Sequence, residues 1–440
     1  MAGDGVPTAT RNASGFTLFL GGLAAFSAYF AMYAFRKPFA VATYAEVAGW
    51  NFTLDYKTAL LIAQVIGYAV SKCIGVRIIS ETGRRGRART ILGLISASWI
   101  ALILFALVPA PWNVACLFLN GLPLGLIWGL VFSYVEGRRA SELLGSMLCA
   151  SFILSSGVVK SVAMLLMEAG LGERWMPAAT GLVFAPLLLI ALWQLERMPP
   201  PDARDEAERT KRRPMHAADR AAFLRAHGAT QVLLVLGYVL LTALRDVRDA
   251  YATELWTALG YGGDAAVFSA SELPVALLAL GALALLMLIR DNLRALLAIH
   301  GLILLGALCL GISTLAFQAG LMAPLTWMIV AGAGLYLAYT PFNAMLFDRM
   351  IATIGTAANA GFLIYIADAS GYVGSVALLL AHSLGAPEVQ WLSFFITCCY
   401  ATAVTVGVLT LLSALHFLKT GRTRHGSSPR GARSSLSRSG

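Results

Sequence analysis

The chain has 440 residues, of which 58% are apolar and only 13% are charged, and its formal net charge is +10. This composition excludes an ordinary water-soluble domain and indicates an integral membrane protein. The Lys and Arg residues collect in loops between apolar segments, so the positive charge reflects membrane topology and does not indicate nucleic-acid binding.

Twelve apolar segments follow one another along the chain, each long enough to cross roughly 30 Å of hydrocarbon as a helix. They cover approximately residues 15–37, 57–78, 90–109, 112–134, 143–167, 175–195, 229–252, 265–289, 295–317, 323–347, 356–381 and 390–418. None alternates in the way that membrane β-strands do, so the sequence predicts an all-α membrane protein with twelve transmembrane helices.

The loops predict the orientation, because Lys and Arg accumulate on the cytoplasmic side of a membrane. Cations gather in loops 84–89, 138–139 and 290–294 and in the mid-chain segment 196–228, whereas the loops near Pro109, Gly262, Gly320 and Gly385 have no Lys or Arg. We therefore expect a protein of the cell (inner) membrane with both termini in the cytoplasm.

The longest polar stretch divides the chain into six spans plus six. We expect a cytoplasmic N-terminus (1–14), a first six-helix bundle (15–195), a cytoplasmic linker (196–228) with a short surface helix at Ala217–Ala226, a second bundle (229–418) and a basic disordered tail (419–440). Two pseudo-symmetric six-helix bundles are typical of large secondary transporters. Gly and Pro residues concentrate in spans four and ten, which are equivalent in the two halves, and predict bent helices that line a cavity.

Ionisable residues inside the apolar segments are the strongest functional signal. Span one ends in the adjacent pair Arg36 and Lys37, and such cations are costly unless a partner, a water-filled cavity or an anionic ligand compensates them. Equivalent spans carry further charges, largely of opposite sign: Lys72 in span two and Glu272 in span eight, Lys160 in span five and Asp368 in span eleven, and Arg245, Asp246, Arg248 and Asp249 in span seven. Each is either a functional residue or a structural ion-pair member. A local pair between Arg245 and Asp249, four residues apart, is one structural alternative.

The run Tyr29-x-x-x-Tyr33-x-x-Arg36-Lys37-x-Phe39-Ala resembles the first-span signature of the organophosphate:phosphate antiporters, a branch of the major facilitator superfamily that includes glycerol-3-phosphate and hexose-phosphate transporters. Further similar stretches are Gly67-Tyr68-Ala-Val-Ser71-Lys72-Cys-Ile-Gly75, Ser271-Glu272, Gly355-Thr356-Ala-Ala and Gly371-Tyr372-Val-Gly374-Ser375. At the level of topology the resemblance covers most of the chain.

The resemblance implies alternating access around a central site lined by spans one, four, seven and ten. Arg36 and Arg245 would clamp an anion, Lys72 would correspond to the lysine of span two, and Tyr29, Tyr33 and Asn343 would be neighbours of the ligand. Lys37 and Asp249 would form an ion pair between spans one and seven. From the packing of such transporters we expect two more pairs as gates, Lys72 with Asp368 and Lys160 with Glu272. Either Glu272 or Asp368 is also a candidate carrier of a coupling proton.

Two departures leave the substrate open. The loop after span two carries Glu81 as its only acid where the branch has an Asp-Arg pair, and Ser155 stands near the position of the branch's span-five histidine. Phosphate specificity is therefore not implied, and a carboxylate or another anion remains an alternative.

We expect a secondary active transporter of a small organic anion, with organophosphate/phosphate antiport as one form of it. The chain would act as a monomer in the lipid bilayer, with a counter-substrate or a proton as its coupling partner. It would be no enzyme and would hold neither a metal nor a cofactor. The alternatives are a transporter-like sensor that binds an anion without moving it and, less favoured, a polytopic membrane enzyme. The latter calls for a His, Asp or Glu cluster at one membrane face, which the sequence does not show.

Overall fold

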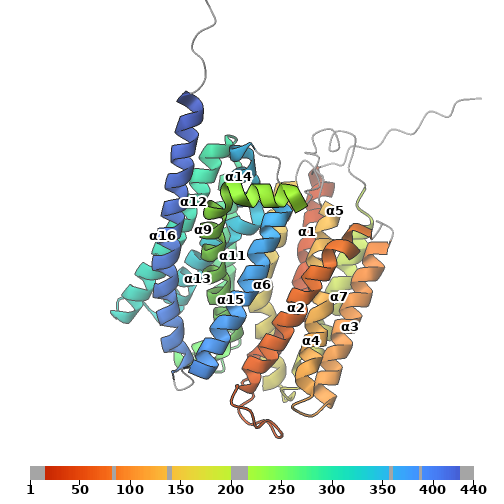
Figure 1. The fold of residues 1–440 in the computed structure, drawn as a ribbon. Coiled ribbons are helices and arrows are strands. Elements are labelled where there is room, and N and C mark those ends of the chain that lie inside the picture. Colours follow the sequence, from red (N-terminus) through yellow and green to blue (C-terminus); the bar gives the residue numbers. More distant parts are fainter. Residues whose placement is uncertain are drawn as a thin grey trace, which may run out of the picture.

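The computed structural model describes residues 15–81, 86–135, 141–199, 217–355, 360–385 and 389–426, and the regular secondary structure within them is helical (Figure 1). The first half, here the N-half, contains α1 (Gly15–Tyr33), the short 3-10 helix η1 (Pro38–Val41), α2 (Tyr56–Glu81), α3 (Arg87–Leu107), α4 (Asn113–Leu124), α5 (Ile127–Val135), α6 (Ser141–Glu168) and α7 (Met176–Glu196). The second half, the C-half, contains α9 (Ala217–Ala250), α10 (Ala252–Ala258), α11 (Ala266–Met287), α12 (Asn292–Gln318), α13 (Pro324–Pro341), η3 (Phe342–Leu346), α14 (Phe347–Ile354), α15 (Ala360–Gly385) and α16 (Trp391–Gly426).

Every predicted span coincides with one helix or with a broken helix, which confirms the all-α membrane class. Ten helical stretches in the described parts are long and apolar enough to cross a membrane, and α1 contributes a shorter apolar stretch, Leu18–Tyr33. The predicted surface helix at Ala217–Ala226 forms the first part of α9, and α16 continues into the predicted tail as far as Gly426.

Several predicted features lie outside the described residues. They are the N-terminus 1–14, linker residues 200–216, tail residues 427–440, the loop cations Arg84, Arg85, Arg138 and Arg139, and Thr356, Ala357 and Ala358 of the span-eleven motif.

Spans four and ten are interrupted at equivalent places, as their proline content predicts. Span four divides into α4 and α5 directly after Pro123, and span ten changes from α-helix to a π-helical turn, η3, directly after Pro341. A proline lacks the N–H group of a regular helical turn and its ring clashes with the preceding turn, so the helix breaks or widens there. The π-helical turn holds Asn343, one of the predicted site residues.

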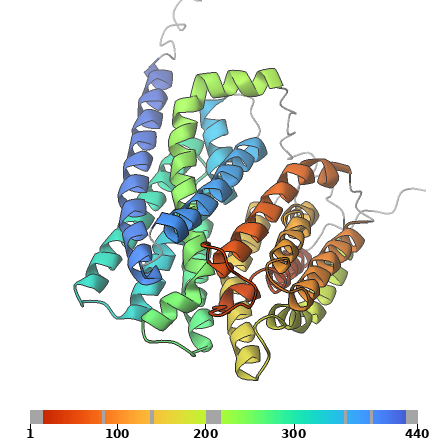
Figure 2. The ribbon, with the colours of Figure 1, turned by 60° about the horizontal axis from the view of Figure 1, so that its bottom comes forward.

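The two halves contact each other along two helix pairs, α2 with α15 and α6 with α11, as expected. Figure 2 shows α15, in blue, between α9 of its own half and α2 of the other half. In the second pair α6 approaches α11 so closely that a Cβ atom at Gly157 would lie 2.5 Å from the carbonyl oxygen of Phe268. Only glycine allows this backbone approach.

One end of the molecule, opposite the end where α1 begins and α16 finishes, holds contacts between the halves. We call it the far end and the other the terminal end. Phe39 and Tyr56 of the N-half belong there to the same apolar cluster as Tyr251 and Trp256 of the C-half, and this cluster extends through the C-half. The side chain of Thr253 also donates a 2.9 Å hydrogen bond to the Val41 carbonyl. Packing therefore closes the far end, which the loop charges predict to be extracellular.

Candidate functional site

Arg36 is a buried cation that has no carboxylate partner among the residues that the structure describes. The chain leaves α1 in a tight turn, in which the N–H group of Arg36 donates to the Tyr33 carbonyl over 3.0 Å. Its guanidinium carbon lies 3.9 Å from the ring centre of Tyr68 and 5.7 Å from that of Tyr33. Only 8% of the residue is exposed, and its Nε atom has no hydrogen-bond partner. Aromatic faces offset part of the cost of a desolvated cation, and the guanidinium keeps donors for an oxyanion.

Arg245, the second predicted anion ligand, is neutralised within its own half. Its Nη2 and Nε atoms donate to one carboxylate oxygen of Asp246 over 2.7 and 3.1 Å, and its Nη1 atom donates to the hydroxyl of Tyr339. The hydroxyl of Ser375 donates to the other Asp246 oxygen over 2.7 Å. The alternative of a local pair between Arg245 and Asp249 is wrong for this conformation, because Arg245 pairs with Asp246 whereas Asp249 pairs with Lys37 and Lys160.

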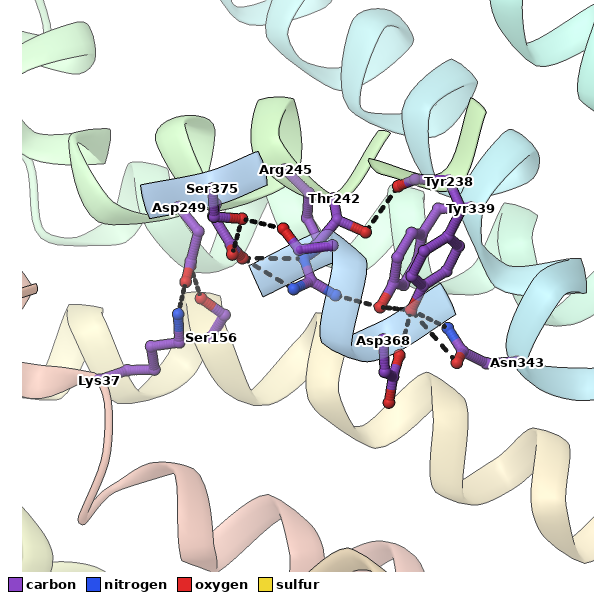
Figure 3. Close-up of polar contacts among 12 residues, drawn as sticks. Lys37, Ser156, Tyr238, Thr242, Arg245, Asp249, Tyr339, Asn343, Asp368 and Ser375 are labelled. Carbon is purple, nitrogen blue, oxygen red and sulfur yellow. Dashed lines mark hydrogen bonds and ion pairs between the residues drawn. The ribbon is translucent and has the colours of Figure 1, made fainter. Parts of the chain in front are cut away.

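A continuous chain of polar contacts runs from Arg245 to Asp368 (Figure 3). Asp368 in turn pairs with Lys72 of the other half. From Arg245 the contacts pass to the hydroxyl of Tyr339, then over 3.0 Å to the hydroxyl of Tyr238, which donates to the Asp368 carboxylate. The ion pair between Asp368 and Lys72 completes the chain. The expected contact between Lys72 and Asp368 is therefore present, and the chain connects the predicted anion site with the boundary between the halves.

The three expected neighbours of the ligand lie around these groups. The rings of Tyr29 and Tyr33 are buried and pack edge to face with centres 5.5 Å apart. The ring centre of Tyr33 lies 5.7 Å from the guanidinium carbon of Arg36. The side-chain amide of Asn343 donates a 3.2 Å hydrogen bond to the hydroxyl of Tyr238, so Asn343 contacts the polar chain rather than either arginine.

Asp249 joins two lysines of the N-half to the C-half. Its carboxylate forms the expected ion pair with Lys37 and a second ion pair with Lys160 on α6, and it accepts a hydrogen bond from the hydroxyl of Ser156. The side chains of Lys160 and Asp249 are 4% and 10% exposed, so water screens this cluster little. Two cations therefore share one buried carboxylate at the contact between the halves.

The expected pair between Lys160 and Glu272 is wrong for this conformation. Lys160 contacts Asp249, while Glu272 on α11 pairs with Arg248 at 2.5 Å. Arg248 also donates to the Met328 carbonyl over 3.2 Å, and a Cβ atom at Gly332 would lie 2.6 Å from its Nη2 atom. Arg248 lies next to Asp249 in the sequence, and its guanidinium extends across α13 to a carboxylate of its own half. Comparing the charged residues of equivalent spans could not show whether position 248 or position 249 of α9 faces α6.

The sequence interpretation missed further residues of the far-end closure. Lys57 pairs with Glu254 at 2.5 Å across the halves, although only 2% of the lysine side chain is exposed. Next to it the hydroxyls of Thr58 and Tyr251 lie 2.5 Å apart, and the Ser383 hydroxyl donates to that of Thr58 over 3.2 Å. Lys57 stands at the edge of a predicted span, so its charge was indistinguishable from an ordinary loop anchor.

Tyr238, which the sequence interpretation missed, could have been identified from its spacing to charged residues on the same helix. Tyr238, Thr242, Arg245 and Asp249 follow each other at intervals of four, three and four residues on α9, and therefore share one helix face. In the same way Tyr68 lies one turn before Lys72, and Tyr372 lies one turn after Asp368. Aromatic residues at helical spacing from a buried charge would have identified all three.

Among the described residues, no group of three or more His, Cys, Asp or Glu side chains could hold a metal ion. What the site offers is a set of buried cations, hydroxyl groups and paired carboxylates where the two halves meet. This arrangement can bind an anion and can exchange one ion-pair partner for another.

Comparison with known proteins agrees with this geometry. A model of a family of unknown function, DUF5690, matches residues 38–420, a segment that begins directly after Arg36 and Lys37. No curated protein shows significant sequence similarity to the chain.

Solved structures of transporters share its architecture. A D-xylose–proton symporter superposes with a TM-score of 0.58 at 15% identity and covers 92% of this chain and 97% of its own. A bacterial homologue of the human drug peptide transporters PepT1 and PepT2 gives 0.59 at 15% identity, with 92% and 98% covered. A bacterial homologue of the human lysosomal transporter Spinster gives 0.55 at 12% identity, with 94% and 98% covered. The chain therefore belongs to the DUF5690 family of unknown function, and its fold is that of the major facilitator superfamily.

Proposed function

We propose that this protein is a secondary active transporter that moves a small organic anion across the membrane by alternating access. The observation that supports this most directly is Arg36, which is buried in the turn after α1 and has no carboxylate partner among the described residues. A buried cation without a counter-ion is costly, so its presence favours a ligand that supplies the negative charge.

The distribution of contacts supports the transport cycle. The far end is closed by Lys57 with Glu254, by the Asp249 cluster and by the apolar cluster described above, so the site would be reached from the terminal end in this state. Opening the far end requires these ion pairs to break and one half to rock against the other. Transporters built from two similar helical bundles expose a central site alternately to the two sides of the membrane by this kind of movement. Lys37, Lys160 and Asp249 act in this proposal as one gate, and Lys72 with Asp368 as another.

The head group remains open between phosphate and carboxylate, because a guanidinium binds both with paired donors. Organophosphate/phosphate exchange is the finer form that the sequence resemblance favours. The absence of a histidine near Ser155 leaves that form without one of its expected ligands.

Uptake into proteoliposomes tests the proposal. Radiolabelled inorganic phosphate, glycerol 3-phosphate and succinate are offered to vesicles loaded with phosphate or with buffer alone. We expect saturable uptake of at least one anion, and a loss of about tenfold or more in Arg36→Gln, the size of a lost charge-assisted hydrogen bond. Arg294→Gln, which removes an exposed arginine at the start of α12, is the matched control and should transport normally.

Two results would contradict the proposal. Saturable binding of an anion without uptake would favour the sensor, and equal uptake by Arg36→Gln and Arg294→Gln would remove Arg36 from the site.

A further inference from the structure

An apolar groove of about 500 Å³ runs along the contact between α2 and α15, where the N-half meets the C-half. Its walls include Ile66, Val70 and Val373, whose exposed fractions are 43%, 38% and 70%. Both helices belong to predicted membrane spans, so these exposed side chains face hydrocarbon and the groove opens sideways into the bilayer. Its volume lies within the range of about 300–1,000 Å³ that is usual for sites of small organic ligands.

The groove has one polar end and one apolar end. The polar end is at Lys72, which pairs with Asp368 and is 22% exposed, and the lining continues along α15 as far as Leu380. Twelve residues separate Asp368 from Leu380, which is about 18 Å along a helix. Since α15 begins at the terminal end, the polar end faces that side and the apolar part extends toward the far side. An amphiphile of the membrane leaflet at the terminal end would be oriented like the groove, with its head group at Lys72 and its alkyl chain toward the bilayer centre.

Tyr68 connects this groove to the central cation. Its ring lies 3.9 Å from the guanidinium carbon of Arg36 and 5.5 Å from the ammonium nitrogen of Lys72. Its edge contact with Tyr372, at 5.5 Å between ring centres, joins α2 to α15 and stands between the groove and Arg36. Among the described residues the charged groups around Tyr68 are Arg36, Lys72 and Asp368, and together they carry one excess positive charge. A head group with a single negative charge would balance it.

We infer that the α2–α15 groove binds the alkyl chain of a single-chain anionic amphiphile, whose head group contacts Lys72 and, once Tyr68 and Tyr372 separate, Arg36. The inference deepens the function proposed above, on which it rests, by naming the substrate class. The head group competes with Asp368 for Lys72, and Asp368 keeps its hydrogen bond from Tyr238. The head can come from a free fatty carboxylate or from a single-chain phospholipid, and both have the same chemistry of one anionic group on one chain.

Photolabelling of the full chain in lipid nanodiscs tests the site. Three C16 probes carry a diazirine in the chain: a carboxylate, a lysophosphatidic acid and the uncharged alcohol. We expect the anionic probes, and not the alcohol, to label residues of α2 and α15 at the groove, and excess unlabelled anion to suppress this labelling about tenfold. The stronger of the two anionic probes identifies the source of the head group.

Two pairs of variants make the test specific. Val373→Trp fills the groove, whereas Val404→Trp places the same ring on α16 at a position that is 67% exposed and lies outside the groove, so only the first should lose labelling. Lys72→Gln combined with Asp368→Asn removes the charges without leaving an unpaired carboxylate and should lower anionic labelling about tenfold, as expected for a lost charge-assisted contact. Lys72→Arg keeps the cation and should retain labelling.

Equal labelling by the alcohol and the anions, or equal labelling in the two tryptophan variants, would show annular lipid only and overturn the inference. The photolabelling and the uptake measurements together distinguish a failure of the groove site from a failure of the proposed transport function. Failure of groove labelling with Arg36-dependent uptake of short anions overturns only the groove site. Specific labelling without any uptake overturns the transporter and leaves the groove as a binding site.

Discussion

The ammonium group of Lys72 on α2 contacts the carboxylate of Asp368 on α15, although 296 positions separate the two residues in the chain. This ion pair joins the two halves within the span region and has Tyr238 as its third member. Its position means that any rocking of one half against the other must change the environment of both charges.

A charge exchange tests whether this pair couples the halves. We expect Lys72→Asp and Asp368→Lys each to impair uptake strongly, because each leaves like charges together at a partly buried site, and the double variant to recover most of the loss. The measurement is a double-mutant cycle on initial uptake rates in proteoliposomes.

The matched control exchanges Lys160 and Glu272, which have other partners in this conformation. Lys160→Glu with Glu272→Lys should show no recovery. Recovery in the control pair, or none in the Lys72 and Asp368 pair, would contradict the assignment.

The Asp249 cluster should hold the far end closed. Asp249→Asn removes the carboxylate that Lys37 and Lys160 share, and breaking a buried pair in this way costs roughly 3–5 kcal/mol. We expect the population to shift toward an open far end. Spin labels at Trp112 and Leu321, which are 74% and 83% exposed and lie in loops of opposite halves, would report this as longer distances in pulsed electron resonance.

Asp264→Asn is the control for that experiment, since Asp264 is an exposed residue that only caps the start of α11. Its distance distribution should match that of the parent chain. An unchanged distribution in Asp249→Asn would show that the ion pair of Lys57 with Glu254 and the apolar cluster close the far end without the Asp249 cluster.

The hydroxyl of Tyr238 should matter more for transport than for stability. Tyr238→Phe keeps the stacked ring but removes the group that contacts Asp368, Tyr339 and Asn343. A hydrogen bond to a charged group contributes about 1.5–3 kcal/mol, so we expect uptake to fall by about tenfold or more. Tyr400→Phe removes a single 2.7 Å contact with Gln318 and serves as the control, with normal uptake expected. Equal rates in the two variants would remove Tyr238 from the coupling chain.

The close approach of α6 and α11 predicts a packing effect. Gly157→Ala places a methyl group against the Phe268 carbonyl and against the Glu272 side chain, where the backbone cannot move aside. We expect the free energy of unfolding to fall by about 1–3 kcal/mol, the usual cost of overpacking. Thermal unfolding of the purified protein measures this. Gly281→Ala on α11, where nothing lies within 4 Å of the added carbon, should not lower the melting temperature.

The sequence predicted the membrane class, the positions of the spans, the breaks at Pro123 and Pro341, and two of the expected ion pairs. These follow from local properties: a bilayer demands long apolar helices, and a proline interrupts the helix in which it stands. The partners of Lys37 and Lys72 could be predicted only from the resemblance to a known family. A single sequence carries little information on how helices that are distant in the chain pack against each other.

By itself, then, the sequence determined that buried charges stand in equivalent spans of two similar halves. The tertiary structure decided their partners, and the reason is helix geometry. Successive residues of an α-helix point about 100° apart. On α9 this directs Arg245 to Tyr339, Arg248 to Glu272 and Asp249 to Lys37 and Lys160, within little more than one turn. Only the placement of the surrounding helices could show that Arg36 pairs with no carboxylate of the described residues and that an apolar groove lies beside Lys72.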